Sequence, residues 1–286
     1  MAVPDYISEN FLHSFIVAAL AEDIGDGDHS TLAAIPETST KRVRLLVKDN
    51  GILAGVALAV RIFQHYDPAL RIETYLNDGS IIKRGDIAFS VSGSARSLLT
   101  TERLVLNCMQ RMSGIATKTK HLVELVAGTK ARLLDTRKTT PNFRLLEKWA
   151  VAIGGGGNHR LGLFDMIMLK DNHTDMAGGI AQAINRTKEY LRAENKNLRI
   201  EVETRNLDEV RQVLGAGGVD VIMLDNMSTD QMKEAIQLID GRCETEASGN
   251  ITEETIRSVA NCGVDYISVG ALTHSVKSLD LSLKAY

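Results

Sequence analysis

The sequence has few cysteines, no long hydrophobic run and no excess of positive charge. Its three cysteines, Cys108, Cys243 and Cys262, form no CxxC pair and no disulfide framework, which favours small buried thiols in a reducing compartment. No stretch approaches the roughly 18 apolar residues that suggest a membrane-spanning helix. The N-terminus carries acids and lacks a basic leader followed by an apolar run. We therefore expect a cytoplasmic protein without a membrane partner.

The charge balance restricts the partners further. A formal net charge of −3 argues against a nucleic-acid or anionic-membrane partner, either of which would favour a strongly basic surface. Hydrophobic and charged contents of 44% and 24% are ordinary for a globular protein. Any cationic site must therefore be a local concentration on a mildly acidic body.

Helices are predicted at two places in the first 130 residues. Ser8 can cap a helix over about residues 9–21, whose apolar residues share one face. The polar segment Asp23–Asp28 that follows is interpreted as a turn, because it lacks the ligand positions of a calcium loop. Residues 95–127 are expected to be mostly helical, with a break at Ser113-Gly114.

Between these helices, residues 41–93 have the pattern of strands separated by turns. Part of Gly51–Gln64 could instead be a helix after Gly55, and periodicity alone does not decide. The predicted strands are Val43–Lys48, Gly51–Val60, Leu70–Leu76 and Ile87–Val91.

After about residue 130, short apolar runs recur, and each is followed by a helix-like stretch. From Lys170 onward the runs end at 170, 203, 225, 248 and 270, which is the spacing of βα units. Continuous apolar strands of this kind suit a buried parallel sheet. The runs are Arg132–Asp135, Met166–Lys170, Arg199–Glu203, Val219–Asp225, Glu244–Ser248 and Tyr266–Gly270.

The pattern predicts an α/β fold, an incomplete (TIM-like) α/β barrel with an N-terminal α+β sandwich domain. An open doubly wound sheet is the alternative, but no GxGxxG opens a helix after its first strand, so a dinucleotide site is not expected. We expect the N-terminal domain at residues 1–112 and the barrel at 113–275. The tail, residues 276–286, is expected to pack back on the first domain.

Catalytic groups of barrels lie where strands end and βα loops begin. Five cations occupy such predicted places within 34 residues: Arg137, Lys138, His159, Arg160 and Lys170. The planar donor forks of the arginines suit substrate carboxylates, and the lysines act as point charges. Any one of them is more often a solvated surface charge, and a lone histidine is more often structural. The concentration of five favours a site for polyanionic substrates.

Acids and glycine loops follow at the later strand ends. Glu201 and Asp225 could hold Mg²⁺ or sugar hydroxyls. Ser248-Gly249-Asn250 and the backbone near Gly270 could bind a phosphate through main-chain N–H groups. The residues alone therefore predict an anion-handling barrel enzyme and do not name its reaction.

Four ordered motifs strongly resemble the quinolinate phosphoribosyltransferase (decarboxylating) family, also called nicotinate-nucleotide pyrophosphorylase. The motifs are Asp135-Thr-Arg-Lys-Thr-Thr-Pro141, Arg144-Leu-Leu-Glu-Lys-Trp-Ala150, Gly155-Gly-Gly-Asn-His-Arg-Leu-Gly-Leu163 and Leu169-Lys-Asp-Asn-His173. The resemblance covers nearly the whole chain. It implies an incomplete barrel plus an N-terminal sandwich domain, in dimers or larger oligomers whose active sites are completed by the neighbouring subunit.

The resemblance also implies a reaction in NAD biosynthesis. The phosphoribosyl group of phosphoribosyl pyrophosphate would join the quinolinate nitrogen, pyrophosphate would leave, and the ring 2-carboxylate would be lost as CO₂. The product would be nicotinate mononucleotide. The pyridine nitrogen has its own lone pair, so no general base is required.

The resemblance assigns roles to individual residues. Quinolinate would contact Arg137, His159, Arg160 and Lys170, with Arg103 donated across the subunit interface. Lys138, Glu201 and Asp225 would be catalytic, and Glu201 and Asp225 would be the Mg²⁺ ligands. Phosphoribosyl pyrophosphate would contact Lys138, Glu201, Asp225, Ser248, Gly249, Asn250 and Gly270. The sequence departs from the family pattern at His29-Ser30 and at Asn250, where many relatives have glycine.

Three alternatives stay open on the sequence. Lys170 could form a Schiff base in an aldolase-like barrel. A related phosphoribosyltransferase could use another pyridine or heterocyclic acid. A ligand-binding sensor could keep the pocket without turnover, although Glu201, Asp225 and Lys138 argue against a pocket that only senses.

Overall fold

The computed structural model describes residues 3–286, which form two compact units. The first unit consists of the residues up to 120, 139–155 and 272–286, and the second of 121–138 and 156–271. Each unit is thus assembled from separated stretches of sequence. The predicted division into residues 1–112 and 113–275 placed only the C-terminal tail, residues 276–286, back with the first domain. In the structure, residues 139–155 also belong to the first unit.

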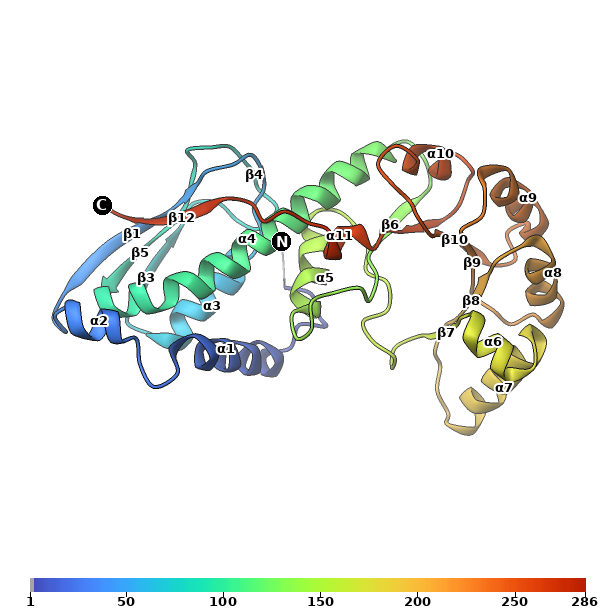
Figure 1. The fold of residues 1–286 in the computed structure, drawn as a ribbon, viewed down its shortest axis with the longest axis horizontal. Helices are drawn as coiled ribbons and strands as arrows, with labels where there is room; N and C mark the ends of the chain where they lie inside the picture. Colours follow the sequence, from blue (N-terminus) through green and yellow to red (C-terminus); the bar gives the residue numbers. More distant parts are fainter. Residues whose placement is uncertain (1–2) are drawn as a thin grey trace. The chain divides into compact units, whose positions relative to one another are not determined.

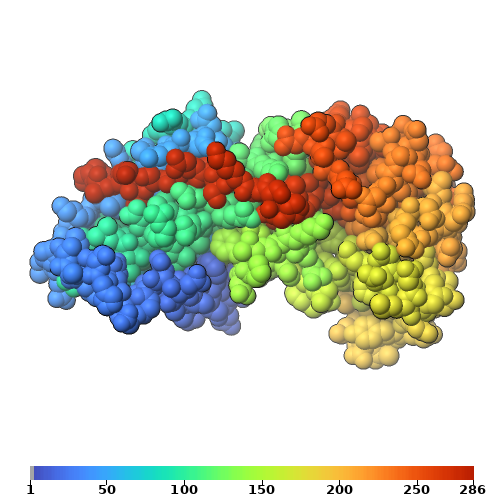
Figure 2. All heavy atoms as spheres, in the orientation of Figure 1, coloured from blue at the N-terminus to red at the C-terminus, as the bar shows by residue number. Residues whose placement is uncertain are grey.

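The first unit is built around a four-stranded antiparallel sheet in the order β12-β1-β5-β3. The C-terminal strand β12 pairs with β1, and the space-filling view shows these last residues, in red, on the surface beside the lighter blue segment that contains β1 (Figure 2). The strands are β1 (Thr40–Val47), β2 (Gly51–Ile52), β3 (Arg71–Thr74), β4 (Ile81–Ile82), β5 (Ile87–Ser94) and β12 (Leu281–Ala285).

Helices α3 and α4 lie alongside this sheet (Figure 1). The rings of Phe63 on α3 and Phe89 on β5 meet edge to face at 6.1 Å, both fully buried. The helices are α1 (Glu9–Ile24), α2 (His29–Ala34), α3 (Val56–Tyr66), α4 (Ala95–Leu125, in this unit up to residue 120), α5 (Arg144–Ile153) and α11 (Ala271–His274, in this unit from residue 272).

The first helix begins where the sequence predicts it. Ser8 is the N-cap of α1, and its side chain accepts a hydrogen bond from the Phe11 N–H at 3.1 Å. The turn after it is also present, since Gly25 ends α1 and Asp28 caps α2.

The strand predicted at Gly51–Val60 is only two residues long, and the alternative helix after Gly55 is correct. The reason is a distant carboxylate. Asp78 is buried and accepts hydrogen bonds from the N–H groups of Val56 and Ala57 at 2.8 and 3.1 Å, so it satisfies the free amides of the first turn of α3. No local pattern contains that contact.

The predicted break at Ser113-Gly114 is wrong, because α4 is continuous from Ala95 to Leu125. Both residues are explained by close packing instead. The Ser113 hydroxyl bonds the backbone of Ala54, and a Cβ on Gly114 would lie 2.4 Å from the Lys277 carbonyl oxygen. The small residues let two other chain segments approach the helix.

The second unit contains a six-stranded parallel sheet in the order β6-β11-β10-β9-β8-β7. Each strand from β8 to β11 lies beside its predecessor, β11 returns to β6, and the sheet stays open between β6 and β7. The strands are β6 (Arg132–Leu134), β7 (Ile167–Leu169), β8 (Ile200–Thr204), β9 (Val221–Asp225), β10 (Glu244–Ser248) and β11 (Tyr266–Ser268).

This one-directional order confirms the incomplete barrel and excludes the doubly wound alternative, whose strand order would reverse at a switch point. Helices lie along the outer side of the sheet, and consecutive ones contact each other (Figure 1). They are α6 (Asp171–Ala177), α7 (Ile180–Ala193), α8 (Leu207–Ala216), α9 (Thr229–Ile239) and α10 (Ile256–Ala260). Among the described residues, no helix is both long and apolar enough to cross a membrane.

Alternation along the strands gives this sheet two chemically different faces. Val202, Ile222, Leu224, Ala247 and Ile267 are fully buried and share one face by register. The residues between them point to the other face and include Glu201, Glu203, Asp225, Glu246 and Ser248. The polar face therefore carries most of the predicted acids.

A buried ion pair joins separate segments of the first unit. The guanidinium of Arg111 donates two hydrogen bonds to Glu147, at 3.0 and 2.8 Å, and Glu147 is fully buried. Thr140 adds its N–H and hydroxyl to the same carboxylate, at 3.1 and 2.9 Å. Arg111 also donates to the carbonyls of Thr273 and Val276. The pair thus connects α4, α5, the loop before α5, α11 and the segment after α11.

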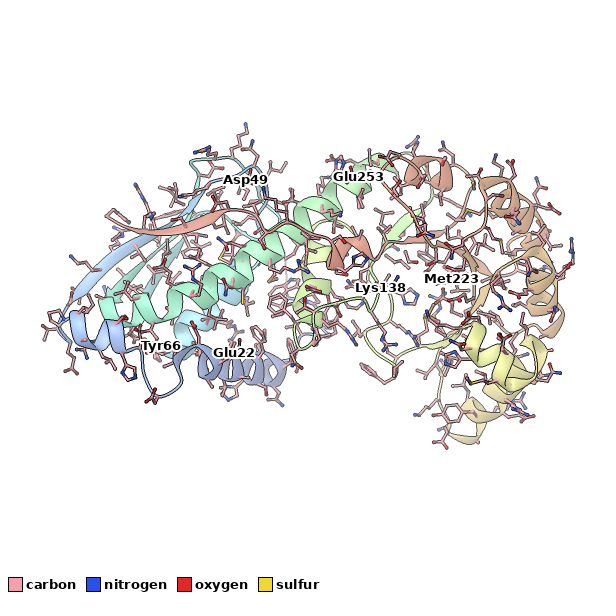
Figure 3. All side chains as sticks on the ribbon, in the orientation of Figure 1. Glu22, Asp49, Tyr66, Lys138, Met223 and Glu253 are labelled. Atoms are coloured by element: carbon pink, nitrogen blue, oxygen red, sulfur yellow. The ribbon has the colours of Figure 1, made fainter. Side chains whose placement is uncertain are left out.

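We expect Glu147→Gln to lower the free energy of unfolding by about 3 kcal/mol, because it leaves the partly buried Arg111 charge without its counterion. Urea denaturation measures this. Glu253→Gln is the matched control: Glu253 pairs with His121 at 3.3 Å, is more than half exposed, and is labelled in Figure 3. Its loss should cost less than about 1 kcal/mol. Equal effects of the two substitutions would contradict the role assigned to burial.

Candidate active site

The end of β6 organises the loop that carries His159. Asp135 is fully buried and accepts hydrogen bonds from the Asn158 side chain at 2.7 Å and from the His159 N–H at 2.9 Å. Gly157 forms a parallel bridge with Leu134, and a Cβ there would lie 2.8 Å from the Leu134 side chain. This glycine allows the loop to run directly beside β6. Close packing therefore explains one glycine of the four-glycine run, and that glycine needs no ligand to explain it.

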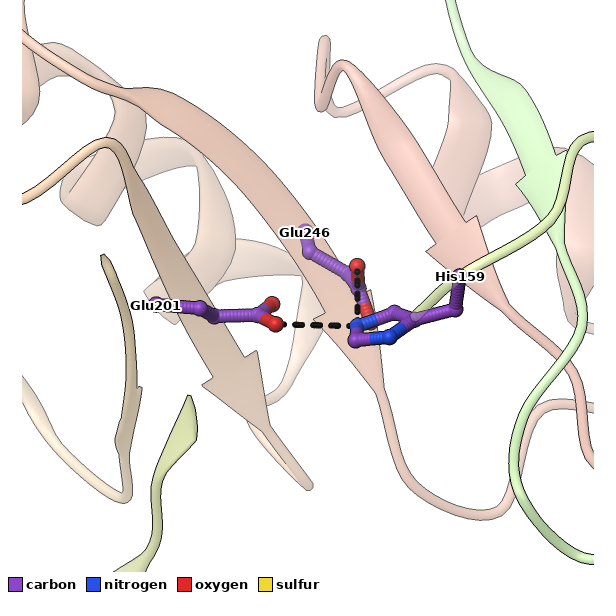
Figure 4. A group of neighbouring side chains, drawn as sticks. All are labelled: His159, Glu201 and Glu246. Atoms are coloured by element: carbon purple, nitrogen blue, oxygen red, sulfur yellow. Dashed lines mark hydrogen bonds and ion pairs between the residues drawn. The ribbon is translucent and has the colours of Figure 1, made fainter. Parts of the chain in front are cut away.

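His159 reaches two acids on neighbouring parts of the sheet (Figure 4). Its Nε2 lies 2.9 Å from Glu201 Oε2 on β8 and 3.5 Å from Glu246 Oε2 on β10. The three side chains are at most 8% exposed. One nitrogen and one oxygen from each acid lie within 4.8 Å of one another, so the group has the donor set of a cation site.

The hydrogen bonds of His159 decide which ring nitrogen carries the proton. Nδ1 accepts the Arg160 N–H at 2.8 Å, which requires a lone pair on Nδ1. The proton therefore lies on Nε2 and is donated to Glu201. The ring is neutral in this arrangement, and the prediction that His159 contributes a positive charge does not fit the geometry. A metal ion at the cluster would have to replace that proton.

Burial raises the pKa values of both acids. The pKa of Glu201 is raised to about 7, and that of Glu246 to about 8, with the neighbouring Glu201 charge as a further cause for Glu246. The second oxygen of each acid, Oε1, is buried without a hydrogen-bond partner. Two such acids beside a neutral imidazole favour a state in which one of the two carboxyl groups keeps its proton.

Two predicted carboxylate ligands, Arg137 and Arg160, are electrostatic neighbours. Burial lowers the pKa of the Arg160 guanidinium, and the charge of Arg137 lowers it further, whereas Glu201 and Asp165 oppose the shift. The Arg160 guanidinium still carries its charge at neutral pH. Two like charges close together at a partly buried place are stabilised when a dianion binds between them.

The predicted lysines differ in their surroundings. Lys170 follows β7, is about half exposed, and lies 3.6 Å from Glu203 on β8. Lys138 is exposed on the loop after β6, where its N–H donates to the Thr136 hydroxyl at 3.1 Å (Figure 3). Burial raises the pKa of Glu203. The nearby charge of Asp225 raises it further, whereas Lys170 lowers it. Lys170, Glu203 and Asp225 thus share the carboxyl edge of the sheet.

The structure brings the predicted phosphate loop to Asp225. The Asn226 amide donates to Asp225 at 2.7 Å and accepts from the Asn250 amide at 3.0 Å. The Asn226 N–H donates to the Ser248 carbonyl, and a Cβ on Gly249 would lie 2.2 Å from Asn226 Oδ1. Gly249 has a φ of 92°, so glycine is required both by space and by conformation.

The two predicted metal ligands are not brought together. By register, Glu201 lies beside Val221, whereas Asp225 lies four residues further along β9. At roughly 3.3 Å per residue the offset is about 13 Å, which is too far for both side chains to ligate one ion. The acid beside Asp225 is Glu203. The metal prediction therefore needs correction: Asp225 lies at the rim, and Glu201 lies deeper with His159.

The remaining predicted site residues are Gly270 and Arg103. Gly270 follows β11 and belongs to the same unit as the cluster. Arg103 is exposed on α4 in the first unit, so the structure does not relate it to the other site residues.

Residue patterns missed three side chains that shape the site. The sequence pattern put Asp135 and Glu203 at strand ends without giving either a role, and it put Glu246 inside an apolar run. A signal for Glu246 was present, because it alternates with Ser248 on one face of a strand and an acid in a buried strand needs a partner.

Comparison with known proteins gives two family matches that together cover most of the chain. Residues 28–113 match the family described as quinolinate phosphoribosyl transferase, N-terminal domain. Residues 115–284 match the family described as quinolinate phosphoribosyl transferase, C-terminal domain.

Similar full-length proteins carry related names. The chain is 50% identical to nicotinate-nucleotide pyrophosphorylase (carboxylating), chloroplastic, of Arabidopsis thaliana, covering 96% of this chain and 82% of that one. It is 48% identical to quinolinate phosphoribosyltransferase (decarboxylating) 2b, mitochondrial, of Nicotiana tabacum, covering 93% and 80%. The crystal structure of NadC from Streptococcus pyogenes matches with a TM-score of 0.91 at 41% identity, covering 98% and 99%.

The two raised pKa values predict a pH dependence of stability. A carboxyl group with a higher pKa when folded favours folding fully below the unfolded value of 4.5, and that contribution is lost as pH rises through about 7 to 8. We expect the unfolding free energy of wild type relative to Glu246→Gln to fall by about 1 kcal/mol per pH unit between pH 5 and 7. Urea denaturation at several pH values tests this. A difference that does not change with pH would contradict it.

Proposed function

The chain belongs to the quinolinate phosphoribosyltransferase family, and on that premise we propose that it transfers the phosphoribosyl group of phosphoribosyl pyrophosphate to quinolinate with loss of CO₂. The products are nicotinate mononucleotide, pyrophosphate and CO₂, so the enzyme serves NAD biosynthesis. The observation that carries the substrate assignment is the pair of neighbouring guanidiniums, Arg137 and Arg160, which suits a small dianion at a barrel end.

The quinolinate side of the site consists of Arg137, Arg160 and Lys170. A pyridine dicarboxylate would relieve the repulsion between the arginines, each of which presents a planar donor fork to a carboxylate. Lys170 would add a point charge after release from Glu203. His159 would act through the Arg160 backbone, because its own Nε2 proton is donated to Glu201.

The reaction needs few groups that exchange protons. The quinolinate nitrogen attacks the anomeric carbon with its own lone pair, and the bond to pyrophosphate breaks with positive charge developing on the ribose. Carboxylates near the ribose stabilise that charge. Glu201 Oε1, which is buried without a hydrogen-bond partner, is the acceptor offered to a ribose hydroxyl. The quaternised ring nitrogen then accepts the electrons left by the departing CO₂.

The diphosphate side lies at the rim with Asp225. Lys138 on its exposed loop, the Ser248-Gly249-Asn250 loop and Gly270 would bind the phosphates of phosphoribosyl pyrophosphate. Mg²⁺ prefers one or two carboxylates together with substrate phosphates. Asp225 fits that role, whereas Glu201 does not share its place. When bound, the ion would neutralise charge on the leaving pyrophosphate.

The proposal also includes an oligomeric state and a cellular location. We propose a homodimer or larger oligomer in which a neighbouring copy supplies Arg103 to each site. We also propose a cytoplasmic location, for which the free cysteines, two of them buried, suit a reducing compartment. The plant relatives are named chloroplastic or mitochondrial, so fractionation of the native cell decides the compartment.

The function is tested by release of CO₂ from quinolinate labelled at the 2-carboxylate. We expect release only when phosphoribosyl pyrophosphate and Mg²⁺ are both present, with one nicotinate mononucleotide formed per CO₂. Turnover of nicotinate without turnover of quinolinate would move the protein to a sibling activity. Binding of quinolinate without turnover would favour a sensor. Borohydride trapping of Lys170 with substrate would favour the Schiff-base alternative.

Shared sites are tested by mixing two inactive variants. Arg103→Ala and Lys138→Ala should each lose roughly 30-fold or more of activity, because each removes a charge that contacts substrate. In a mixed dimer one of the two sites regains both groups, so a 1:1 statistical mixture should recover about a quarter of wild-type activity. Recovery no greater than either parent would show that Arg103 does not act on the neighbouring copy's site.

A further inference from the structure

Glu246 is a buried acid for which the proposed reaction has no direct use. It lies in the middle of β10, between Met223 and Tyr266 of the adjacent strands, and is 1% exposed. Its Oε2 is 3.5 Å from His159 Nε2. A strand interior gives it little freedom to move.

His159 is fixed at three separate atoms. Its N–H donates to Asp135 at 2.9 Å, its Nδ1 accepts the Arg160 N–H at 2.8 Å, and its Nε2 faces Glu201 and Glu246. The orientation of the ring therefore determines where the Arg160 backbone lies, and the Arg160 guanidinium is proposed to bind quinolinate.

One proton on Nε2 faces two acceptors. In the substrate-free protein Glu201 is the nearer, at 2.9 Å, and Glu246 stands at 3.5 Å. A ribose hydroxyl that engages Glu201 would draw that carboxyl group away from the ring. A buried N–H left without an acceptor is costly, and a second acceptor in place avoids that loss.

We propose that Glu246 is a positioning residue for the phosphoribosyl transfer. It holds the His159 ring in its Nε2–H form while Glu201 interacts with the second substrate, and so keeps Arg160 in place for the pyridine dicarboxylate. This inference rests on the proposed function for its kinetic consequence. The geometry of the ring can be tested without turnover.

The kinetic test compares three variants of the full chain. Glu246→Leu removes the acceptor at similar volume, and we expect it to raise KM for quinolinate by about tenfold while KM for phosphoribosyl pyrophosphate changes less than about twofold. Glu246→Gln keeps an acceptor oxygen, and its KM for quinolinate should stay within about threefold of wild type. Met223→Leu changes packing at the same level of the sheet and should leave both constants unchanged.

A second measurement reads the ring directly. Nitrogen-15 spectra of histidine-labelled protein, recorded with phosphoribosyl pyrophosphate bound so that Glu201 is engaged, should show His159 as the single Nε2–H tautomer in wild type and Glu246→Gln, and as a mixture in Glu246→Leu. A His159→Gln spectrum assigns the signal among the seven histidines.

Several results would overturn the inference. They are unchanged quinolinate binding and an unchanged tautomer in Glu246→Leu, equal impairment of Glu246→Gln and Glu246→Leu, or an equal rise of both KM values. If wild type fails to turn over quinolinate, the proposed function fails instead, and the spectra still decide whether Glu246 holds the ring.

Discussion

Two carboxyl groups buried inside an incomplete barrel are the constraint on which the site depends. Glu201 and Glu246 point to the same side of the sheet from different strands, and a buried acid must be neutralised or hydrogen-bonded. His159 supplies one proton to this pair because Asp135 and Gly157 bring its loop alongside β6. The loop is therefore placed by the acids and by β6 together, and the position of Arg160 follows from it.

The architecture was predictable because it depends on repeating local signals. Apolar runs at βα spacing gave six strands, and their order in the sheet follows from successive right-handed crossovers. The two errors, at Gly51–Val60 and at Ser113-Gly114, share a cause. In each case a distant group, the Asp78 carboxylate or the Lys277 carbonyl, determines what the segment does, and no window of sequence contains both partners.

Sequence patterns predict the residues at the rim of the candidate site much better than the residues deeper in the barrel. Strand ends reveal Arg137, Lys138, Lys170 and Asp225, because parallel strands bring their carboxyl ends to one edge. How deep a side chain lies in the barrel depends on the register between strands, which the sequence alone does not determine. Thus Glu201 was paired with Asp225 on chemistry alone, whereas in the structure it meets Glu246 at the His159 ring. The neutral state of His159 depends on a local contact, the Arg160 N–H on Nδ1, whereas the acids that face its Nε2 are far away in sequence.

The offset between these two levels has a chemical consequence. Asp225, Asn226 and Asn250 form a hydrogen-bonded group at the rim, and the acids of the His159 group lie earlier along the strands, Glu246 two residues and Glu201 four residues before the level of Asp225. Metal ions and phosphates need an exposed, exchangeable rim, because Mg²⁺ gives up its water reluctantly. A reacting centre with developing positive charge instead benefits from acids shielded from water, where each charge acts more strongly. Separating the acids by depth therefore lets one polar barrel face serve both requirements.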